Sequence, residues 1–484
     1  MSFWDQLDAF GNASCIEGEM TLSYGDVAGL ADGIFSEVLR ENNKKALALI
    51  VCGRDVATLL GYLGCLRSGV TTIHLPDDMS YAGISDYITR YKPQYLWCKK
   101  KLYSEFLANE KTALYSLYDY ALVDLRFDDD GVDGYEIDEN EISESEINDE
   151  LALLLTTSGT TADPKLVRLS YENLQANADS ISQCLEISPD SKPITLLPFN
   201  YSFGLSVINS HLNSGSAIVF SNEGLTSRGF WDVFKALGVT SFYGVPYHYE
   251  ILKKFRFTRL DFPSLSLMAQ AGGRMPDSLK QEFYDLSKTK GYRFVCMYGQ
   301  TEATARITYL PSSRYELKSK SVGIAIPGGV LSIKNPDKNN VGEVHYQGAN
   351  VSLGYASCTQ DLVENNVNQG ELDTGDFGYL DADGYLFLTG RKKRYIKVFG
   401  NSVNLDHVEK IACEISAMAA VIGRDNEIRV LTIDGQTESV KAKILSMTTI
   451  HPKALSVVAI DGLLYKSSGK IDYGELSKRY LEND

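Results

Sequence analysis

The stretch LALLLTTSGTTADPKLVRLS, residues 151–170, joins an apolar run to a turn rich in hydroxyl groups. The run 151–155 is typical of a buried β-strand. The turn 156–161 carries five hydroxyl side chains around one glycine, Gly159, and Lys165 follows. Hydroxyls, a glycine that lets backbone N–H groups approach an anion, and one lysine are groups that bind phosphate. The nucleotide loop G-x-x-x-x-G-K-[ST] is not matched, so from this stretch alone a phosphate loop and a polar turn both remain open.

Strand-like and helix-like segments alternate on both sides of this stretch. Apolar runs that predict strands lie at 46–51, 70–75, 194–199, 217–221, 266–271 and 294–299. Segments with helical periodicity lie at 55–69, 205–212, 229–237 and 277–288. This alternation predicts an α/β fold with largely parallel sheets. From about residue 320 short strands and glycine turns prevail, and the region from about 392 to 484 mixes one amphipathic helix, 404–416, with strands.

Composition narrows the class of protein. At 484 residues the chain is too long for one ordinary core, and its 44% hydrophobic and 23% charged residues are typical of a globular protein. No apolar run approaches the roughly 20 residues of a membrane span. The N-terminal residues MSFWDQLDAF lack the pattern of an export signal, so we expect a cytoplasmic protein. Eight cysteines without a C-x-x-C pair predict reduced, mostly buried thiols.

The net charge of −16 is concentrated in one segment. Residues 127–150 hold twelve acidic residues and no lysine or arginine, so they contribute −12 of the total. A solvated surface segment is the preferred interpretation, ahead of an acidic interaction arm. The overall charge gives no support to nucleic-acid binding.

Four further stretches end or interrupt apolar segments with groups that suit a nucleotide. They are AQAGGRMP (269–276), MYGQTEAT (297–304), the run 371–391, and YKSSGKIDYGEL (465–476). The groups they offer are Gly272 and Gly273; Tyr298, Gly299, Thr301 and Glu302; Asp376 and Arg391; and Lys470. Glycine backbone and an aromatic face suit a nucleobase, hydroxyl and carboxylate suit phosphate with Mg²⁺, and the acid with its arginine suits ribose. Taken singly, each stretch is also compatible with an ordinary turn, loop acid or surface lysine.

The order and spacing of these stretches resemble those of the adenylate-forming enzyme superfamily. That superfamily includes acyl-CoA synthetases, adenylation domains of nonribosomal peptide synthetases and firefly luciferase. TSGTTADPK resembles the family's phosphate loop, usually TSG[ST]TGxPK, and YGQTEAT is similar to its YGxTE motif. DTGDFGYLDADGYLFLTGRKKRYIK resembles its TGD…GRx[DK]xxIK run, and SSGKID its closing GK motif. The resemblance spans essentially the whole chain, and it favours the phosphate loop over the polar turn.

The resemblance implies an architecture and a set of site residues. A large multi-subdomain N-terminal domain, 1–390, would be followed by a small mobile α+β lid, 391–484, that turns about a hinge at Lys393. Lys470, Thr301 and Glu302 are implied to be catalytic, with Glu302 also the Mg²⁺ ligand. The implied ATP-binding residues are Thr157, Ser158, Gly159, Thr160, Thr161, Lys165, Gly272, Gly273, Tyr298, Gly299, Gln300, Thr301, Asp376, Arg391 and Lys470. The implied acid-binding residues are Tyr201 and Gly204.

The implied chemistry is ATP-dependent activation of a small carboxylic acid as acyl-AMP, with pyrophosphate release, followed by transfer to a thiol. A carboxylate is already ionised at neutral pH, so the reaction needs no general base. The thiol acceptor would be coenzyme A, which we favour slightly, or the phosphopantetheine of an acyl carrier protein loaded with an acyl, hydroxy or amino acid. A catalytically degenerate nucleotide-binding homologue is the alternative class, and the joint presence of Lys470, Glu302 and Asp376 argues against it.

Several positions depart from the family pattern. Ala162 stands where the family usually has glycine, and Leu464 and Lys466 replace the usual proline and threonine before Lys470. Amino-acid-activating members commonly place an aspartate near Tyr201 to pair the α-ammonium group. Residues 200–203 supply no charge, so we expect an acid with a neutral tail rather than an α-amino acid.

Overall fold

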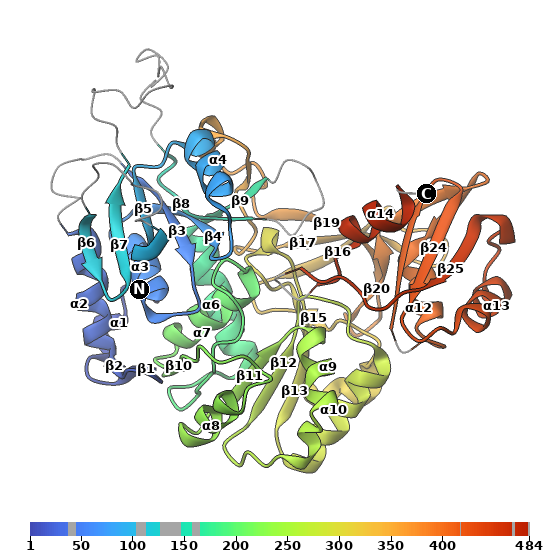
Figure 1. Ribbon diagram of the computed structural model, residues 1–484, viewed down its shortest axis with the longest axis horizontal. Coiled ribbons are helices and arrows are strands. Elements are labelled where there is room, and N and C mark those ends of the chain that lie inside the picture. The colour runs from blue at the N-terminus through green and yellow to red at the C-terminus, as the bar shows by residue number, and fades with distance from the viewer. Residues whose placement is uncertain are drawn as a thin grey trace.

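A computed structural model describes residues 1–36, 45–102, 113–125, 147–156, 165–416, 418–466 and 470–482. Its N-terminal part contains an eight-stranded sheet in the order β18-β9-β8-β4-β3-β5-β7-β6 (Figure 1). These strands are β3 (Leu47–Cys52), β4 (Thr71–Pro76), β5 (Tyr95–Lys99), β6 (Ala113–Leu117), β7 (Tyr120–Asp124), β8 (Leu151–Thr156), β9 (Leu166–Ser170) and β18 (Gly354–Ala356). The central strands β8, β4, β3 and β5 run parallel, whereas the pairs at both edges are antiparallel.

Helices of the N-terminal part pack against this sheet. They are α1 (Leu7–Phe10), α2 (Tyr24–Phe35), α3 (Val56–Arg67), α4 (Tyr81–Tyr91), α6 (Tyr171–Leu185) and α7 (Ser202–Asn213). The side chain of Asp55 caps α3 by accepting a hydrogen bond from the backbone N–H of Thr58. Helix α3 is buried from Val56 to Leu66 because it contacts both α2 and the strands β3 and β4. A small sheet, β10-β1-β2, joins Ile218–Val219 to Ser14–Glu17 and Leu22–Ser23.

A second large sheet has the order β11-β12-β13-β14-β15. Its strands are β11 (Ser241–Gly244), β12 (Leu267–Gln270), β13 (Arg293–Tyr298), β14 (Thr308–Leu310) and β15 (Ile324–Ala325). Strands β11, β12 and β13 are parallel, and β14 and β15 extend the sheet in antiparallel fashion. Its helices are α8 (Arg228–Ala236), α9 (Pro246–Lys254), α10 (Asp277–Lys290) and the short α11 (Tyr315–Lys318). The expected α/β class is therefore correct, but both large sheets are mixed: the parallel pairs lie at the centre of the first sheet and on the β11 side of the second.

The strand expected at 194–199 does not form. The segment makes only two isolated bridges, Pro193 with Ser241 and Ile194 with Val219. Prolines at 193 and 198 lack the backbone N–H that a ladder requires, which explains why an apolar run here stays irregular. Burial of Leu196, Leu197 and Phe199 accounts for the apolar pattern without a strand.

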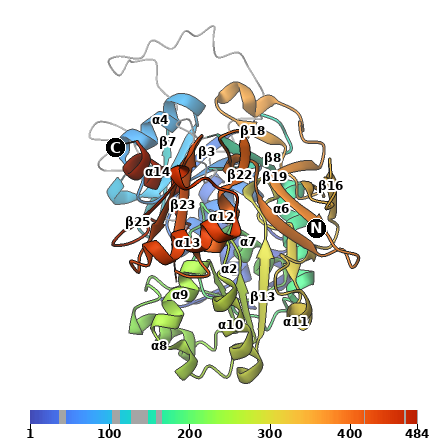
Figure 2. The ribbon, with the colours of Figure 1, turned by 90° about the vertical axis from the view of Figure 1, so that its right-hand side faces the viewer.

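The last third of the chain forms three further sheets. They are β16 (Val330–Lys334), β17 (Gly342–Gln347), β19 (Glu371–Leu380) and β20 (Leu386–Arg391); β21 (Tyr395–Val398) and β22 (Asn401–Asn404); and β23 (Ala419–Arg424), β24 (Glu427–Thr432) and β25 (Leu455–Ala459). Helices α12 (Leu405–Ala412) and α13 (Thr437–Met447) share one apolar cluster with β23–β25, and α14 (Tyr473–Leu481) contributes to another. Figure 1 shows α12, α13, α14, β24 and β25 in orange and red as a group to the right of the rest of the chain, and in Figure 2 this group faces the viewer.

Short 3₁₀ turns connect several elements. They are η2 (Phe257–Arg259), η3 (Thr301–Ala303), η4 (Ser312–Arg314), η5 (Thr359–Val363), η6 (Lys392–Arg394) and η7 (Pro452–Ala454). Within the described ranges no helix is long and apolar enough to cross a membrane. The thiols match the expectation that most are buried: five of the eight cysteines are buried, and Cys413 alone among them is exposed.

Candidate active site

The predicted phosphate loop leaves the carboxyl end of β8, at the edge where parallel strands of an α/β sheet bind ligands. Its residues Thr157, Ser158, Gly159, Thr160 and Thr161 lie outside the described part of the chain. Lys165 is described and exposed, directly before β9. Strands β8 and β9 pair antiparallel, with Thr156 opposite Leu166, so the two ends of the loop are held together.

Three predicted nucleotide-binding residues meet at Asp376. Tyr298, the last residue of β13, donates a hydrogen bond from its hydroxyl to Asp376 Oδ2 at 2.5 Å. Arg391 pairs with the other oxygen, its Nε lying 3.3 Å from Asp376 Oδ1. The two strands set this ion pair, because Asp376 on β19 lies opposite Arg391 on β20. Burial raises the pKa of Asp376, and the positive charge of Arg391 opposes that rise.

Lys470 reaches this region from the C-terminal part of the chain. Its Nζ lies 5.3 Å from the centroid of the Tyr201 ring, a cation–π geometry. Burial is the largest cause that lowers the Lys470 pKa, to about 8, and the nearby cations Arg391 and Lys466 lower it further. The carboxylate of Glu302 acts in the opposite direction. Residues 467–469, which directly precede Lys470 in the sequence, lie outside the described ranges.

A glycine lets Tyr201 approach the backbone. Gly272 has φ +83°, and a Cβ there would collide with the Tyr201 hydroxyl oxygen. Its neighbour Gly273 lies against the Pro246 ring. Gly299 is also required by space, because a Cβ there would overlap the Ala305 carbonyl oxygen. The structure therefore brings the predicted Gly272 and Tyr201 together.

Thr301 and Glu302 lie on η3, directly after the Tyr298–Gly299 strand end. Thr301 Oγ1 is 3.1 Å from the hydroxyl oxygen of Ser202, the first residue of α7. Glu302 Oε1 accepts a hydrogen bond of 2.8 Å from the Tyr355 hydroxyl, an interaction that the motif did not predict. In the described part of the chain Glu302 Oε2 has no hydrogen-bond partner, so this oxygen fits a Mg²⁺ ligand. Mg²⁺ typically takes one or two carboxylates and completes its shell with water and substrate phosphates, so a lone acid is sufficient.

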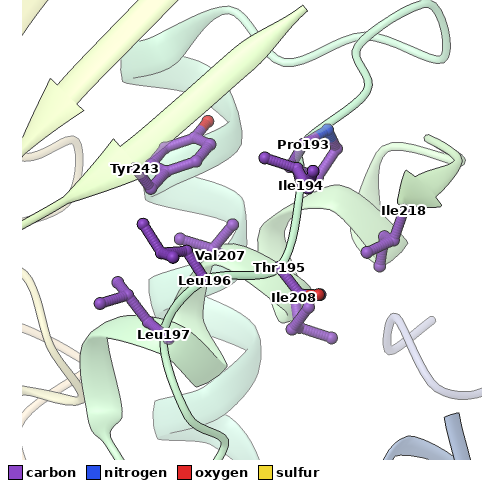
Figure 3. Close-up of a pocket in the computed structure, with 10 residues that line it drawn as sticks. Pro193, Ile194, Thr195, Leu196, Leu197, Val207, Ile208, Ile218 and Tyr243 are labelled. Carbon is purple, nitrogen blue, oxygen red and sulfur yellow. The ribbon is translucent and has the colours of Figure 1, made fainter. Parts of the chain in front are cut away.

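Two further predicted site residues, Gln300 and Gly204, make contacts that hold elements of the fold together. Gln300 donates from Nε2 to the Thr374 carbonyl oxygen over 3.2 Å and so ties the strand end to β19. Gly204 lines a narrow pocket that is also formed by segment 193–197, Val207, Ile208, Ile218 and Tyr243 (Figure 3). A Cβ on Gly204 would overlap the Pro198 carbonyl oxygen, so close packing of α7 on that segment requires glycine here.

Ion pairs flank the predicted hinge on both sides. Lys392 Nζ lies 2.7 Å from Asp373 and 3.0 Å from Glu343, on strands β19 and β17. Arg394 instead pairs with acids that follow the hinge in the chain, Asp406 at 2.7 Å and Glu409 at 2.9 Å. The side chain of Lys393 between them is not among the described ones. The neighbours of Lys393 are thus bound to different parts of the structure.

The sequence reasoning missed a further cation, Arg306. This side chain is only 1% exposed and lies with its guanidinium carbon 4.0 Å from the centroid of the Phe203 ring. The available signal was its place in the run YGQTEATAR, four residues after Glu302. Among the described residues, Glu343, His345 and Asp373 form a cluster of potential metal ligands, but Lys392 is already bound to Glu343 and Asp373.

Comparisons with known proteins agree with this geometry. The family model described as AMP-binding enzyme matches residues 3–356. An oxalate–CoA ligase of Arabidopsis thaliana is 27% identical over 356 residues, covering 69% of this chain and 68% of the ligase. An indoleacetate–CoA ligase of Aromatoleum aromaticum is 29% identical over 283 residues, covering 57% of this chain and only 54% of the ligase. The structure of an o-succinylbenzoate CoA synthetase from Bacillus subtilis with an acyl-adenylate intermediate has a TM-score of 0.75 at 18% identity, covering 98% of this chain and 97% of that one, which confirms the expected fold class.

Proposed function

The chain belongs to the AMP-binding enzyme family, and from this we propose that it activates a small carboxylic acid with ATP. The products of the first half-reaction are an acyl adenylate and pyrophosphate, and a thiol then displaces AMP. The matched relatives are acid–thiol ligases of this type, which supports the enzyme class predicted from the motifs. A cytoplasmic location stays a prediction from the sequence.

The observation that carries the proposal is the placement of Lys470. A lysine near the C-terminus lies over the Tyr201 ring and within electrostatic range of Glu302 and Arg391. Adenylation places negative charge on the phosphate oxygens and on the leaving pyrophosphate. A preorganised cation in a partly desolvated site stabilises such charge more strongly than a cation in water. Lys470 is the side chain we assign to the α-phosphate and the attacking carboxylate.

The remaining residues bind and orient the reactants. We assign the adenine to the backbone at Gly272 and Gly273 and to the Tyr298 ring, whose hydroxyl is already fixed by Asp376. The ribose would exchange hydrogen bonds with Asp376, which Arg391 holds in place. Glu302 would hold Mg²⁺ through its unbonded oxygen, with Thr301 beside it. When bound, Mg²⁺ supplies neutralisation of phosphate charge.

The phosphate loop and the lid complete the proposal. The hydroxyl and backbone groups of residues 157–161, together with Lys165, would cradle the phosphates. The lid would comprise residues 391–484 and turn at Lys393 between the half-reactions. Ion pairs made by Lys392 to one side and by Arg394 to the other support that boundary.

For the thiol acceptor we propose coenzyme A. The oxalate and indoleacetate relatives are coenzyme A ligases, which supports this choice, although a non-ribosomal peptide synthetase of Streptomyces venezuelae also matches, at 28% identity over 344 residues. The alternative acceptor is the phosphopantetheine arm of a carrier protein, because it presents the same thiol.

Acid-dependent exchange of labelled pyrophosphate into ATP tests the first half-reaction. A panel of fatty, aromatic, hydroxy, amino and dicarboxylic acids should contain at least one that supports exchange. Thioester formation with coenzyme A and with a phosphopantetheinylated carrier protein, run in parallel, then identifies the acceptor. Absence of exchange with every acid, in a folded protein that binds ATP, would favour the degenerate homologue instead.

A further inference from the structure

Arg306 is a buried cation with no acidic partner in the part of the chain that the structure describes. It lies between β13 and β14 and is 1% exposed. Its Nε donates to the Met297 sulfur over 3.3 Å, and its Nη1 donates to the Ala305 carbonyl oxygen over 3.4 Å. Across the described ranges no carboxylate lies within ion-pair distance of its guanidinium. Two long hydrogen bonds to neutral acceptors use little of the capacity of a group with five donors.

A second buried arginine shows the usual arrangement. Arg168 is 0% exposed, and its Nη1 lies 3.3 Å from the Glu364 carboxylate, while Nη2 donates to main-chain carbonyl oxygens. Burying a cation costs several kcal/mol unless a partner compensates for the lost hydration. Arg168 therefore has an anionic partner within the fold, whereas the contacts of Arg306 among the described residues are two long hydrogen bonds to neutral acceptors and the face of Phe203.

Burial does not remove the charge of Arg306. Desolvation lowers its pKa to about 10, and the titratable groups that face it are Tyr201, Cys184 and Tyr243. Burial also raises the pKa of all three of these neighbours, so none of them is an anion at neutral pH. Arg306 is thus a protonated cation, and the described titratable groups that face it are neutral.

The position of Arg306 relates it to the proposed acid site. Tyr201 is near both cations, because Lys470 lies over its ring and Arg306 is the charged group that acts on its hydroxyl. Phe203, under the guanidinium, contacts Tyr201 edge-on with centroids 6.1 Å apart. Both aromatic residues belong to an apolar cluster with Met297 and Tyr243. One cation therefore lies where we place the reacting carboxylate, and the other lies within the adjoining apolar cluster.

We propose that the acid activated by this chain carries a second carboxylate, and that Arg306 binds it. The proposal rests on the function assigned above and names its substrate class, a dicarboxylic acid. A planar guanidinium matches a carboxylate with two parallel hydrogen bonds, which supplies the missing compensation. This proposal differs from the neutral-tailed acid expected from residues 200–203, because it takes the charged partner of the acid from residue 306.

The test compares acids of equal length that differ in one charge. Pyrophosphate exchange is measured with saturated α,ω-dicarboxylates from oxalate to adipate and with the monocarboxylates from acetate to hexanoate. We expect a dicarboxylate to exceed its matched monocarboxylate by about 10²-fold or more in kcat/KM, the scale of a buried charge pair. The variant Arg306→Met should lose this preference, mainly through KM for the dicarboxylate, while Arg306→Lys should retain part of it.

Arg168→Met is the matched control, because it also removes a buried arginine. It should lower thermal stability without changing the ratio of dicarboxylate to monocarboxylate activity. Equal loss of both activities in Arg306→Met would make Arg306 a structural residue and would overturn the proposal. A wild-type protein that exchanges pyrophosphate better with monocarboxylates would overturn it too, while leaving the proposed function intact.

Binding measurements separate the two levels of inference. Calorimetry with the same acids in the presence of AMP reports acid binding without chemistry. If no acid supports pyrophosphate exchange, the proposed function fails. Even then, binding of a dicarboxylate that is lost in Arg306→Met would support the site for a second carboxylate. Equal binding of both acid series would overturn it. If Arg306→Met does not fold, the wild-type selectivity and the Arg306→Lys variant decide the outcome.

Discussion

Lys470 allows a prediction that depends on both charge and position. Its pKa is lowered to about 8 by burial and by the cations Arg391 and Lys466. At pH 9 a lysine with a pKa of about 8 is about one-tenth protonated, whereas a lysine at its ordinary pKa would be more than about nine-tenths protonated. If the charge of Lys470 drives adenylation, kcat/KM for ATP should fall about tenfold between pH 7 and pH 9, because this constant reports the free enzyme.

The same reasoning separates kcat from kcat/KM. Bound triphosphate brings negative charge close to Lys470 and raises its pKa in the complex. The alkaline fall of kcat should therefore lie at higher pH than the fall of kcat/KM. Replacing Lys466 with alanine removes a cation that lowers the Lys470 pKa, so the fall of kcat/KM should move to higher pH.

Removing the side chain gives the magnitude of its contribution. Loss of one preorganised charged contact costs about 10² to 10³ in rate, or about 3–4 kcal/mol. Lys470→Ala should show this loss in acid-dependent pyrophosphate exchange, with no remaining alkaline fall above pH 8. ATP binding by calorimetry and thioester formation from a supplied acyl adenylate should be largely retained. Lys470→Arg, if active, should keep its charge and lose the alkaline fall. Near-normal exchange in Lys470→Ala would refute the assignment.

Three further predictions concern the Mg²⁺ ligand, the hinge and the close contact between Gly272 and Tyr201. Glu302→Gln should raise the Mg²⁺ concentration needed for turnover more than it lowers Tm, and an unchanged Mg²⁺ titration with a lowered Tm would make this residue structural. Lys393→Pro should spare pyrophosphate exchange and block thiol transfer, because proline fixes φ near about −65°; equal loss of both in a folded variant would contradict the hinge. Gly272→Ala should reduce exchange about tenfold or more by displacing Tyr201. Gly291→Ala has nearly the same φ, +82° against +83°, but open space around its Cβ, so it should cost stability alone; equal effects on exchange would contradict the contact.

Periodicity and turn residues predicted the regular elements well and the irregular ones poorly. The runs at 46–51, 266–271 and 294–299 became strands because their residues are buried and nothing prevents ladder pairing. The run at 194–199 is equally apolar, but Pro193 and Pro198 have no backbone N–H to donate to a neighbouring strand. An apolar pattern indicates that residues are buried, but a strand also needs backbone N–H groups that can donate hydrogen bonds. Hydrophobicity alone could not separate these cases.

The sequence predicted contacts of the candidate site best where both partners belong to one motif. Asp376 and Arg391 lie opposite each other in a hairpin, so the register of two adjacent strands was enough to pair them. The partner of Glu302, Tyr355, comes from a strand 53 residues away and has no local signal. Arg306 was missed for a related reason, because a charged partner for the acid was sought only in residues 200–203. Arg306 and Phe203 are in contact in space but lie more than 100 residues apart in the chain.

The proposed hinge links the Lys470 prediction to the two half-reactions. Lys392 is bound to strands β17 and β19, and Arg394 is bound to acids at the start of α12, so rotation at Lys393 breaks neither set of ion pairs. The contact between Lys470 and Tyr201 crosses that hinge and must break when the lid turns. Lys470 can then act only on the arrangement in which the adenylate forms. Selective loss of exchange in Lys470→Ala and selective loss of thiol transfer in Lys393→Pro are therefore two consequences of one geometry, and a hinge placed elsewhere would not produce both.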